Sequence, residues 1–293
     1  MAEDLNESIG FEIPVVQTPP DILEGMSAES QSAIFPLIYP DPAYFEFQGT
    51  AFCIGSLANG QMIFVTAKHL LNPLHQGLTK DARLLIPHLH QNARGRTLVL
   101  ALPIDGISIS ESHNDSALVR CDLRNAEGTE LIQVRSVPLT MTRAVVGENT
   151  LAIGYSRHLI TDEHNFARDF RASHGVIEAV YDKSSDSYFG DFPSFQTNSI
   201  YNAGMSGGPV NDEKGRYIGI VSRGVNVSEE VEPWAYATPV ATLSELNIEL
   251  EDDEGGKRDW PFPDLVAAGI VQVTKGTAFG LRHDGSGLSL HWE

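Results

Sequence analysis

Cysteine and positive charge are both scarce in this chain of 293 residues. Two cysteines are too few for the disulfide framework that holds many small secreted proteins together. Lys and Arg number 20 against 39 Asp and Glu, so the net charge is −19 and no basic surface is expected to bind nucleic-acid phosphates. No apolar run approaches the roughly 18 residues of a transmembrane helix. These absences argue against a nucleic-acid-binding or membrane-spanning protein.

The features of a secretory leader are also missing. Residues 1–7 have neither a basic region nor an apolar core. One glycosylation sequon, Asn114-Asp115-Ser116, includes a candidate catalytic residue, so a glycan there would block the site. Together with the low cysteine content, these observations predict a cytoplasmic protein.

Strand-like segments dominate the chain from residue 35 onward. Short runs rich in Val, Ile, Phe, Tyr and Thr, separated by turn residues, recur in two series that join near residues 138–147. Helical periodicity is scarce, and its best candidate is 240–250. The sequence predicts an all-β fold with four segments: an acidic, proline-interrupted arm (1–34), a first β half (35–137), a second β half (138–248), and a solvated acidic linker with a small C-terminal β extension (249–293).

A glycine-rich segment around Ser206 is the first candidate site. A serine hydroxyl becomes a nucleophile when a base takes its proton and nearby N–H groups stabilise the oxyanion. Gly204, Gly207 and Gly208 would let the chain turn tightly enough to point N–H groups into a cleft. By itself the pattern Gly-x-Ser-Gly-Gly also fits a structural hairpin, so it predicts a catalytic serine only in combination with other residues.

His69 and Asp115 are the two residue types that a catalytic serine needs. His69 follows the strand-like run 63–67, and its imidazole titrates near neutral pH, so it can take and return a proton. Asp115 precedes another strand-like run, where its carboxylate would accept a hydrogen bond from the imidazole. The order is His, Asp, Ser, with spacings of 46 and 91 residues. Each residue alone fits a surface or turn position; the combination predicts a catalytic triad.

In these residues the chain resembles the chymotrypsin-like (trypsin-fold) serine peptidases. The family motifs T-A-x-H, D-x-A-L and G-x-S-G-G-P are matched by residues 66–69, 115–118 and 204–209. The second half is most similar to the bacterial high-temperature-requirement branch, in residues 151–155, 174–179, 196–198 and 219–222. The resemblance spans about residues 35–246. It implies two six-stranded antiparallel β-barrels with the active site between them, and a cofactor-independent serine endopeptidase for intracellular protein processing or quality control in a bacterium.

The resemblance also assigns roles to individual residues. The catalytic and oxyanion-hole residues would be His69, Asp115, Ser206 and the N–H groups of Gly204 and Ser206. The substrate-binding residues would be Ile200, Ser222, Arg223 and Gly224, with Ile200 at the base of the specificity pocket and Ser222 also bonded to Asp115. Because Ile200 has no carboxylate to pair with a buried cation, we expect a small or medium apolar side chain before the cleaved bond.

The chain departs from the family pattern in three places. Met205 precedes the serine where trypsin-type zymogens have an aspartate, so no N-terminal cleavage is expected to be needed for activity. Cys53 lies where secreted relatives have a cysteine, but Leu70 stands at the usual position of its partner. Only 45 residues follow the second β half, so no PDZ-like module is expected.

Three other interpretations remain. An α/β-hydrolase esterase would share Gly-x-Ser-x-Gly, but it needs a helix after Ser206 and the order Ser, Asp, His. A catalytically silent scaffold that binds a protein partner stays open, because a fold does not guarantee its chemistry. His88 and His90 on one strand face, with His113, would suggest a metal site, but no further ligand stands out and no metal is predicted. The expected partner is a protein or peptide substrate, with an activating protein as a further option.

Overall fold

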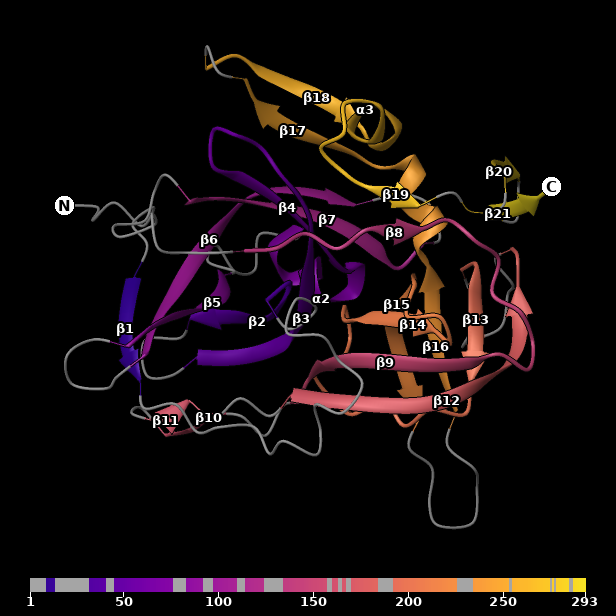
Figure 1. The fold of residues 1–293 in the computed structure, drawn as a ribbon, viewed down its shortest axis with the longest axis horizontal. Helices are drawn as coiled ribbons and strands as arrows, with labels where there is room; N and C mark the ends of the chain where they lie inside the picture. The colour runs from indigo at the N-terminus through magenta and orange to yellow at the C-terminus, as the bar shows by residue number, and fades with distance from the viewer. Residues whose placement is uncertain are drawn as a thin grey trace.

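The computed structural model describes most of the two β halves and the C-terminal region. The described residues are 9–13, 32–40, 45–75, 83–91, 97–109, 114–123, 134–156, 160–162, 165–166, 170–183, 192–225, 234–252, 255–274, 276, 278–284 and 287–293. Among them, no helix is both long enough and apolar enough to cross a membrane. Strands account for nearly all of the regular structure (Figure 1).

The first β half forms a closed six-stranded barrel. Its strands are β2 (Ile34–Pro40), β3 (Phe45–Ser56), β4 (Gln61–Ala67), β5 (Arg83–Gln91), β6 (Thr97–Ile109) and β7 (Ser116–Asp122). They follow the order β6-β5-β2-β3-β4-β7, and pairing of β6 with β7 closes the ring. β4 and β7 are buried along their whole length, because both faces of each strand are covered. One of the two six-stranded barrels that the resemblance implies is confirmed.

The second β half forms a sheet of eight strands that curls as a half-barrel. Its strands are β8 (Leu139–Thr140), β9 (Asn149–Tyr155), β12 (Phe170–Tyr181), β13 (Ser194–Thr197), β14 (Pro209–Asp212), β15 (Tyr217–Val225), β16 (Trp234–Pro239) and β19 (Val273–Thr274). The order is β14-β9-β12-β13-β16-β15-β8-β19, and β14 also pairs with β15. β8 joins β15 and β19 in parallel, which differs from the all-antiparallel barrel that the resemblance implies. A small hairpin of β10 (Ile160–Asp162) and β11 (Asn165–Phe166) lies outside this sheet.

Two segments differ from the expectations for the chain ends. Part of the expected N-terminal arm forms β1 (Ile9–Ile13), which pairs with β6. Part of the expected linker forms β17 (Asn247–Glu251), paired with β18 (Lys257–Pro261). Ile248 and Leu250 on β17 are buried, whereas Glu249 between them is exposed, so apolar residues at every second position outweigh the charge.

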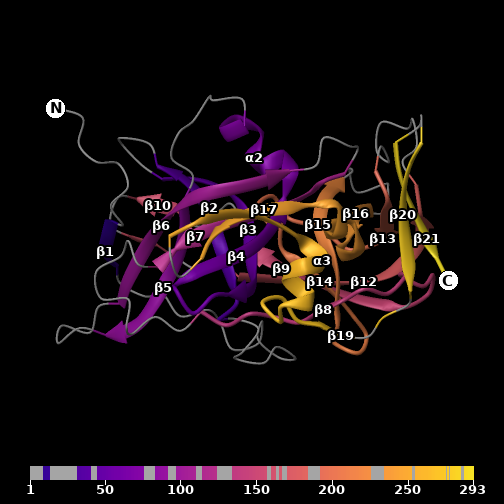
Figure 2. The ribbon, with the colours of Figure 1, turned by 90° about the horizontal axis from the view of Figure 1, so that it is seen from above.

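The remaining C-terminal elements are short. The helix expected over 240–250 is a 3-10 helix, η5 (Val240–Glu245), because β17 begins two residues later. α3 (Phe262–Ala267) follows β18, and β20 (Phe279–Asp284) pairs with β21 (Gly287–Trp292). Figures 1 and 2 both show this last hairpin at the end of the second sheet, far from β1.

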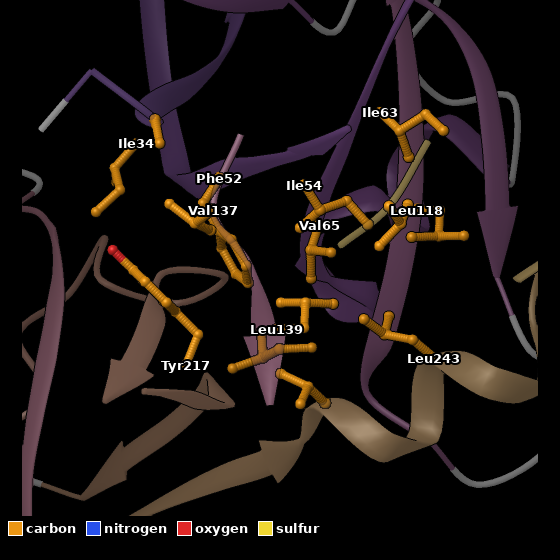
Figure 3. Close-up of a cluster of buried hydrophobic side chains, with 14 of the residues drawn as sticks. Ile34, Phe52, Ile54, Ile63, Val65, Leu118, Val137, Leu139, Tyr217 and Leu243 are labelled. Atoms are coloured by element: carbon orange, nitrogen blue, oxygen red, sulfur yellow. The ribbon is translucent and has the colours of Figure 1, made fainter. Parts of the chain in front are cut away.

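One apolar core joins the two sheets. Phe52 of the barrel stacks on Tyr217 of the second sheet with ring centroids 6.4 Å apart. Leu139 on β8 and Leu243 on η5 lie fully buried beside Val65 of the barrel (Figure 3). Because these contacts join the first β half to the second, residues on β4, β7 and β15 meet at the junction of the two sheets.

Candidate active site

His69 and Asp115 lie at the ends of two neighbouring strands. β4 ends at Ala67, and helix α2 (Lys68–His75) begins there, with His69 in its first turn. Asp115 directly precedes β7, and the register pairs Ala67 with Ser116. His69 Nδ1 consequently lies 2.9 Å from Asp115 Oδ2 and 3.1 Å from Oδ1, while the His69 amide donates to Oδ1 at 3.0 Å. The carboxylate therefore holds both the ring and the backbone of His69.

The Asp115 carboxylate is buried and is also held by the second sheet. Only 6% of Asp115 is exposed, and the Ser222 hydroxyl on β15 donates to its Oδ2. Burial alone would raise the pKa of this carboxyl. The charge of His69 and the hydrogen bonds from His69 and Ser222 outweigh that effect and hold the pKa below its usual value. Asp115 is thus set up as an ionised acceptor for the imidazole.

Ser206 meets the same residue of β15 from the other side. Its hydroxyl donates to the Ser222 carbonyl at 3.2 Å. The following amide, Gly207 N–H, donates to Val221 O at 2.7 Å and anchors the serine loop to this strand. Ser222 therefore contacts both Asp115, through its hydroxyl, and Ser206, through its carbonyl. Asp115 and Ser206, which are far apart in the sequence, therefore converge on one residue of β15.

The turn before Ser206 has a defined geometry. Met205 N–H donates to Asn202 O at 3.0 Å, which closes a four-residue turn. Gly204, its third residue, has a φ of +99°, and no non-glycine residue in the described part of the chain has a positive φ, so Ala203 does not. This combination is a type II turn, which favours glycine at that position. Within the described residues, the N–H groups of Gly204 and Ser206 donate to no protein acceptor.

Thr50 on β3 is a residue of the site that the sequence does not reveal. Its buried hydroxyl donates to Gly204 O at 2.9 Å and accepts from Tyr155 N–H at 2.9 Å. Its amide donates to Ser206 O at 2.8 Å. The first barrel thereby holds the serine loop, which belongs to the second β half. A threonine within a strand has no motif, so no local signal could have identified it.

Of the expected specificity residues, Arg223 and Gly224 directly follow Ser222 on β15. Ile200, expected at the base of the pocket, is 50% exposed, and its amide donates to Ser173 Oγ at 3.0 Å. The next residue, Tyr201, is buried. A methyl group on Gly224 would lie 2.7 Å from Tyr201 O and 2.9 Å from its Cβ. Gly224 and Tyr201 thus lie in direct contact.

Arg223 lies between Ser222 and Gly224 on the same strand. Its guanidinium lies 5.9 Å from the centre of the Phe192 ring, within the range of a cation–π contact. Arg223 pairs across the sheet with Tyr236 of β16. A cationic side chain is therefore present one residue beyond the position that contacts Ser206.

The described histidines and cysteines offer neither a metal site nor an accessible thiol. The described residues contain no group of three or more His, Cys, Asp or Glu side chains that could hold a metal. His88 and His90 belong to β5, whereas His113 lies outside the described residues. Cys53 and Cys121 are buried free thiols.

Comparisons with known proteins agree with this architecture. Residues 49–220 match the model of the trypsin-like peptidase domain. The active form of the Rv3671c protease from M. tuberculosis superimposes with a TM-score of 0.51 at 14% identity, over 89% of this chain and 92% of that one. The serine endoprotease from Yersinia pestis matches at 20% identity (78% and 64% of the two chains, TM-score 0.47), and the HtrA-type protease AlgW with decapeptide at 18% (73% and 63%, TM-score 0.47).

The curated proteins contain no match to this sequence. At 14% identity, the superposition on the Rv3671c protease supports a shared fold. The family model spans more than half of the chain and includes His69, Asp115 and Ser206. The chain belongs to the trypsin-like peptidase domain family.

Proposed function

We propose that the protein is a serine endopeptidase in which Ser206, His69 and Asp115 act as one catalytic unit. The observation that carries the proposal is the convergence at Ser222, which accepts from the Ser206 hydroxyl and donates to the carboxylate that holds His69. Hydrolysis of a peptide bond needs a nucleophile, a base with a fixed tautomer and N–H donors for the oxyanion. The chain has a candidate for each.

The proposed reaction has two halves. Ser206 Oγ attacks the scissile carbonyl carbon while His69 Nε2 takes the hydroxyl proton, and the N–H groups of Gly204 and Ser206 bind the oxyanion. The tetrahedral intermediate collapses, the C–N bond breaks, and the amine leaves with the proton from His69 Nε2. Water then repeats the sequence on the acyl-enzyme: His69 takes a proton from water as the water oxygen bonds to the acyl carbon. The bond from that carbon to Ser206 Oγ then breaks, His69 returns the proton to Ser206 Oγ, and the acid leaves. Asp115 stabilises the imidazolium that forms in each half.

The substrate backbone is proposed to extend β15. Pairing of β14 with β15 ends at Ile220, and Val221 bonds to Gly207 and Gly208, so the sheet pairing on this side stops before Ser222. An extended peptide can add to such an edge through main-chain hydrogen bonds. The contact of Gly224 with Tyr201 leaves little room beside this edge, which supports a small side chain before the cleaved bond.

The proposed enzyme needs no N-terminal processing. The type II turn at Gly204 already leaves both oxyanion N–H groups available, and Met205 supplies no carboxylate for a zymogen-type ion pair. Preorganised donors do not have to be ordered at the moment of reaction. We expect the full-length chain to be active as synthesised.

Labelling by a fluorophosphonate tests this function. The wild-type chain and a Ser56→Ala control, altered at an exposed serine, should label, whereas Ser206→Ala should not. Cleavage of a mixed peptide library then reports the substrate class, with cuts expected after small apolar residues. A wild-type chain that neither labels nor cleaves would instead support the silent scaffold, and cleavage of esters without peptides would support an esterase.

A further inference from the structure

The residues on either side of Asp115 form a buried polar cluster with η5. Asn114 is 4% exposed, and its Oδ1 accepts from the Ser116 amide at 2.9 Å and from the Ser116 hydroxyl at 2.8 Å. Its Nδ2 donates to Glu245 Oε1 at 2.6 Å, with a longer contact of 3.4 Å to Thr242 O. Thr242 Oγ1 donates to Pro239 O at 2.8 Å and lies 3.1 Å from Ser116 Oγ. This cluster brackets Asp115 without contacting its carboxylate.

Glu245 is the last residue of η5 and leads directly into the C-terminal region. Leu246 follows it, donates to Leu243 O at 3.0 Å and accepts from the Phe262 amide at 2.8 Å. η5 is therefore attached at one end to the second sheet and at the other to β17, β18 and α3. The bond between Glu245 and Asn114 connects this C-terminal region to the loop that carries Asp115.

We propose that Glu245, acting through Asn114, is a positioning residue for Asp115, an inference that rests on the proposed function. The backbone holds Asp115 on one side, where its carbonyl accepts from Lys68 N–H at 3.1 Å. The other side is held by the Asn114 amide. Its strongest bond is to the Glu245 carboxylate, because hydrogen bonds to an ionised acceptor are about twice as strong as neutral ones.

Loss of the Glu245 acceptor should move the carboxylate of Asp115. Without it, Asn114 Nδ2 keeps only the long contact to Thr242 O, so the amide can rotate and loosen its bonds to Ser116. Asp115 lies between these two residues. A misplacement of about 1 Å in a catalytic constellation costs roughly 100-fold in rate. The hydrogen-bond partners of Asn114 (Ser116, Thr242 and Glu245) all lie outside β15, so the effect should fall on kcat rather than on KM.

Three variants separate positioning from a structural role. Glu245→Ala removes the acceptor, Glu245→Gln keeps an amide oxygen at Oε1, and Glu213→Ala is the matched control at an exposed glutamate in the turn between β14 and β15. Active sites are counted by fluorophosphonate titration, so that kcat refers to folded enzyme only. We expect Glu245→Ala to lower kcat by about 10- to 100-fold with KM within about twofold. Glu245→Gln and Glu213→Ala should stay near wild type.

A proton NMR measurement makes the test independent of turnover. The proton on His69 Nδ1, shared with Asp115, gives a downfield resonance when the two groups are aligned. Glu245→Ala should shift or broaden it, and Glu245→Gln should restore it. An unchanged resonance and titrated kcat in Glu245→Ala, or a Gln variant as impaired as Ala, would overturn the positioning role. A wild-type chain that neither labels nor cleaves would count against the proposed function instead. The His69 resonance in the Glu245 variants would still show whether Glu245 positions Asp115.

Discussion

The Thr50 hydroxyl offers the sharpest test of how the first barrel holds the serine loop. Thr50→Val keeps the shape of the side chain but removes both the donor to Gly204 O and the acceptor for Tyr155 N–H. Thr50 is fully buried, so water cannot replace either partner. A buried polar group left without a partner costs roughly 1–3 kcal/mol. The two orphaned groups together predict a loss of about 2–6 kcal/mol in the free energy of unfolding.

Thr50→Ser is the matched control, because it keeps the hydroxyl and loses one methyl group, worth about 1 kcal/mol. Urea denaturation of both variants measures the difference between them. Each kcal/mol corresponds to roughly 2–4 °C in Tm for a chain near this size, so Thr50→Val should melt at least about 4 °C below wild type. Because the Gly204 carbonyl loses its anchor, kcat should also fall by about tenfold or more, toward the cost of one lost oxyanion donor. Equal stability and equal kcat of the Val and Ser variants would refute the reasoning.

Three further outcomes follow from the geometry. Gly204→Ala should lower kcat by about 100-fold or more while the fold persists, because an alanine at a φ of +99° strains the turn that presents the oxyanion N–H; wild-type kcat would contradict this. The pKa of Asp115 in the folded chain lies below its unfolded value of about 3.9, so the ionised carboxylate stabilises the fold above pH 3.9, and this stability is lost as the pH falls through the folded pKa. Ser222→Ala removes a hydrogen bond to this carboxylate, so it should raise the folded pKa and move the midpoint of acid unfolding to higher pH. An unchanged midpoint would contradict this expectation. Burial raises the pKa of Cys53 to about 12 and that of Cys121 well above its usual value, so neither thiol should react with a disulfide reagent at neutral pH until urea unfolds the chain.

Short sequence motifs were enough to predict where the candidate catalytic residues lie. His69, Asp115 and Ser206 each stand in a short motif whose residues set the local backbone, so their places beside β4, β7 and β15 could be anticipated. The strand content of the first half followed from strand-like runs in the sequence, whereas its closure into a six-stranded barrel was implied by the family resemblance. The parallel attachment of β8 and β19 did not follow from such runs, because two-residue strands leave no period to detect.

Long-range contacts and mixed signals account for the rest. Thr50 and Gly204 are 154 residues apart, and the contact of Gly224 with Tyr201 also depends on how the strands are placed. No local pattern encodes such pairs. The segment 247–251 carries two signals, acidic charge and apolar residues at every second position, and the buried Ile248 and Leu250 decide in favour of a strand. The strand removes two large apolar side chains from water, which stabilises it, and it leaves the exposed carboxylates solvated, so the acidic charge does not oppose it.

The central claim is that the triad acts as one unit, and a double-mutant comparison tests it most directly. The rate of peptide cleavage is measured for the wild type, Ser206→Ala, His69→Ala and the double variant, each with confirmed folding. Because either loss disables the same step, each single variant should fall by roughly 10⁴-fold or more, and the double variant should fall little further. A Ser206→Ala enzyme that cleaves at a rate comparable to wild type, or a double variant whose loss is the product of the two single losses, would contradict the account.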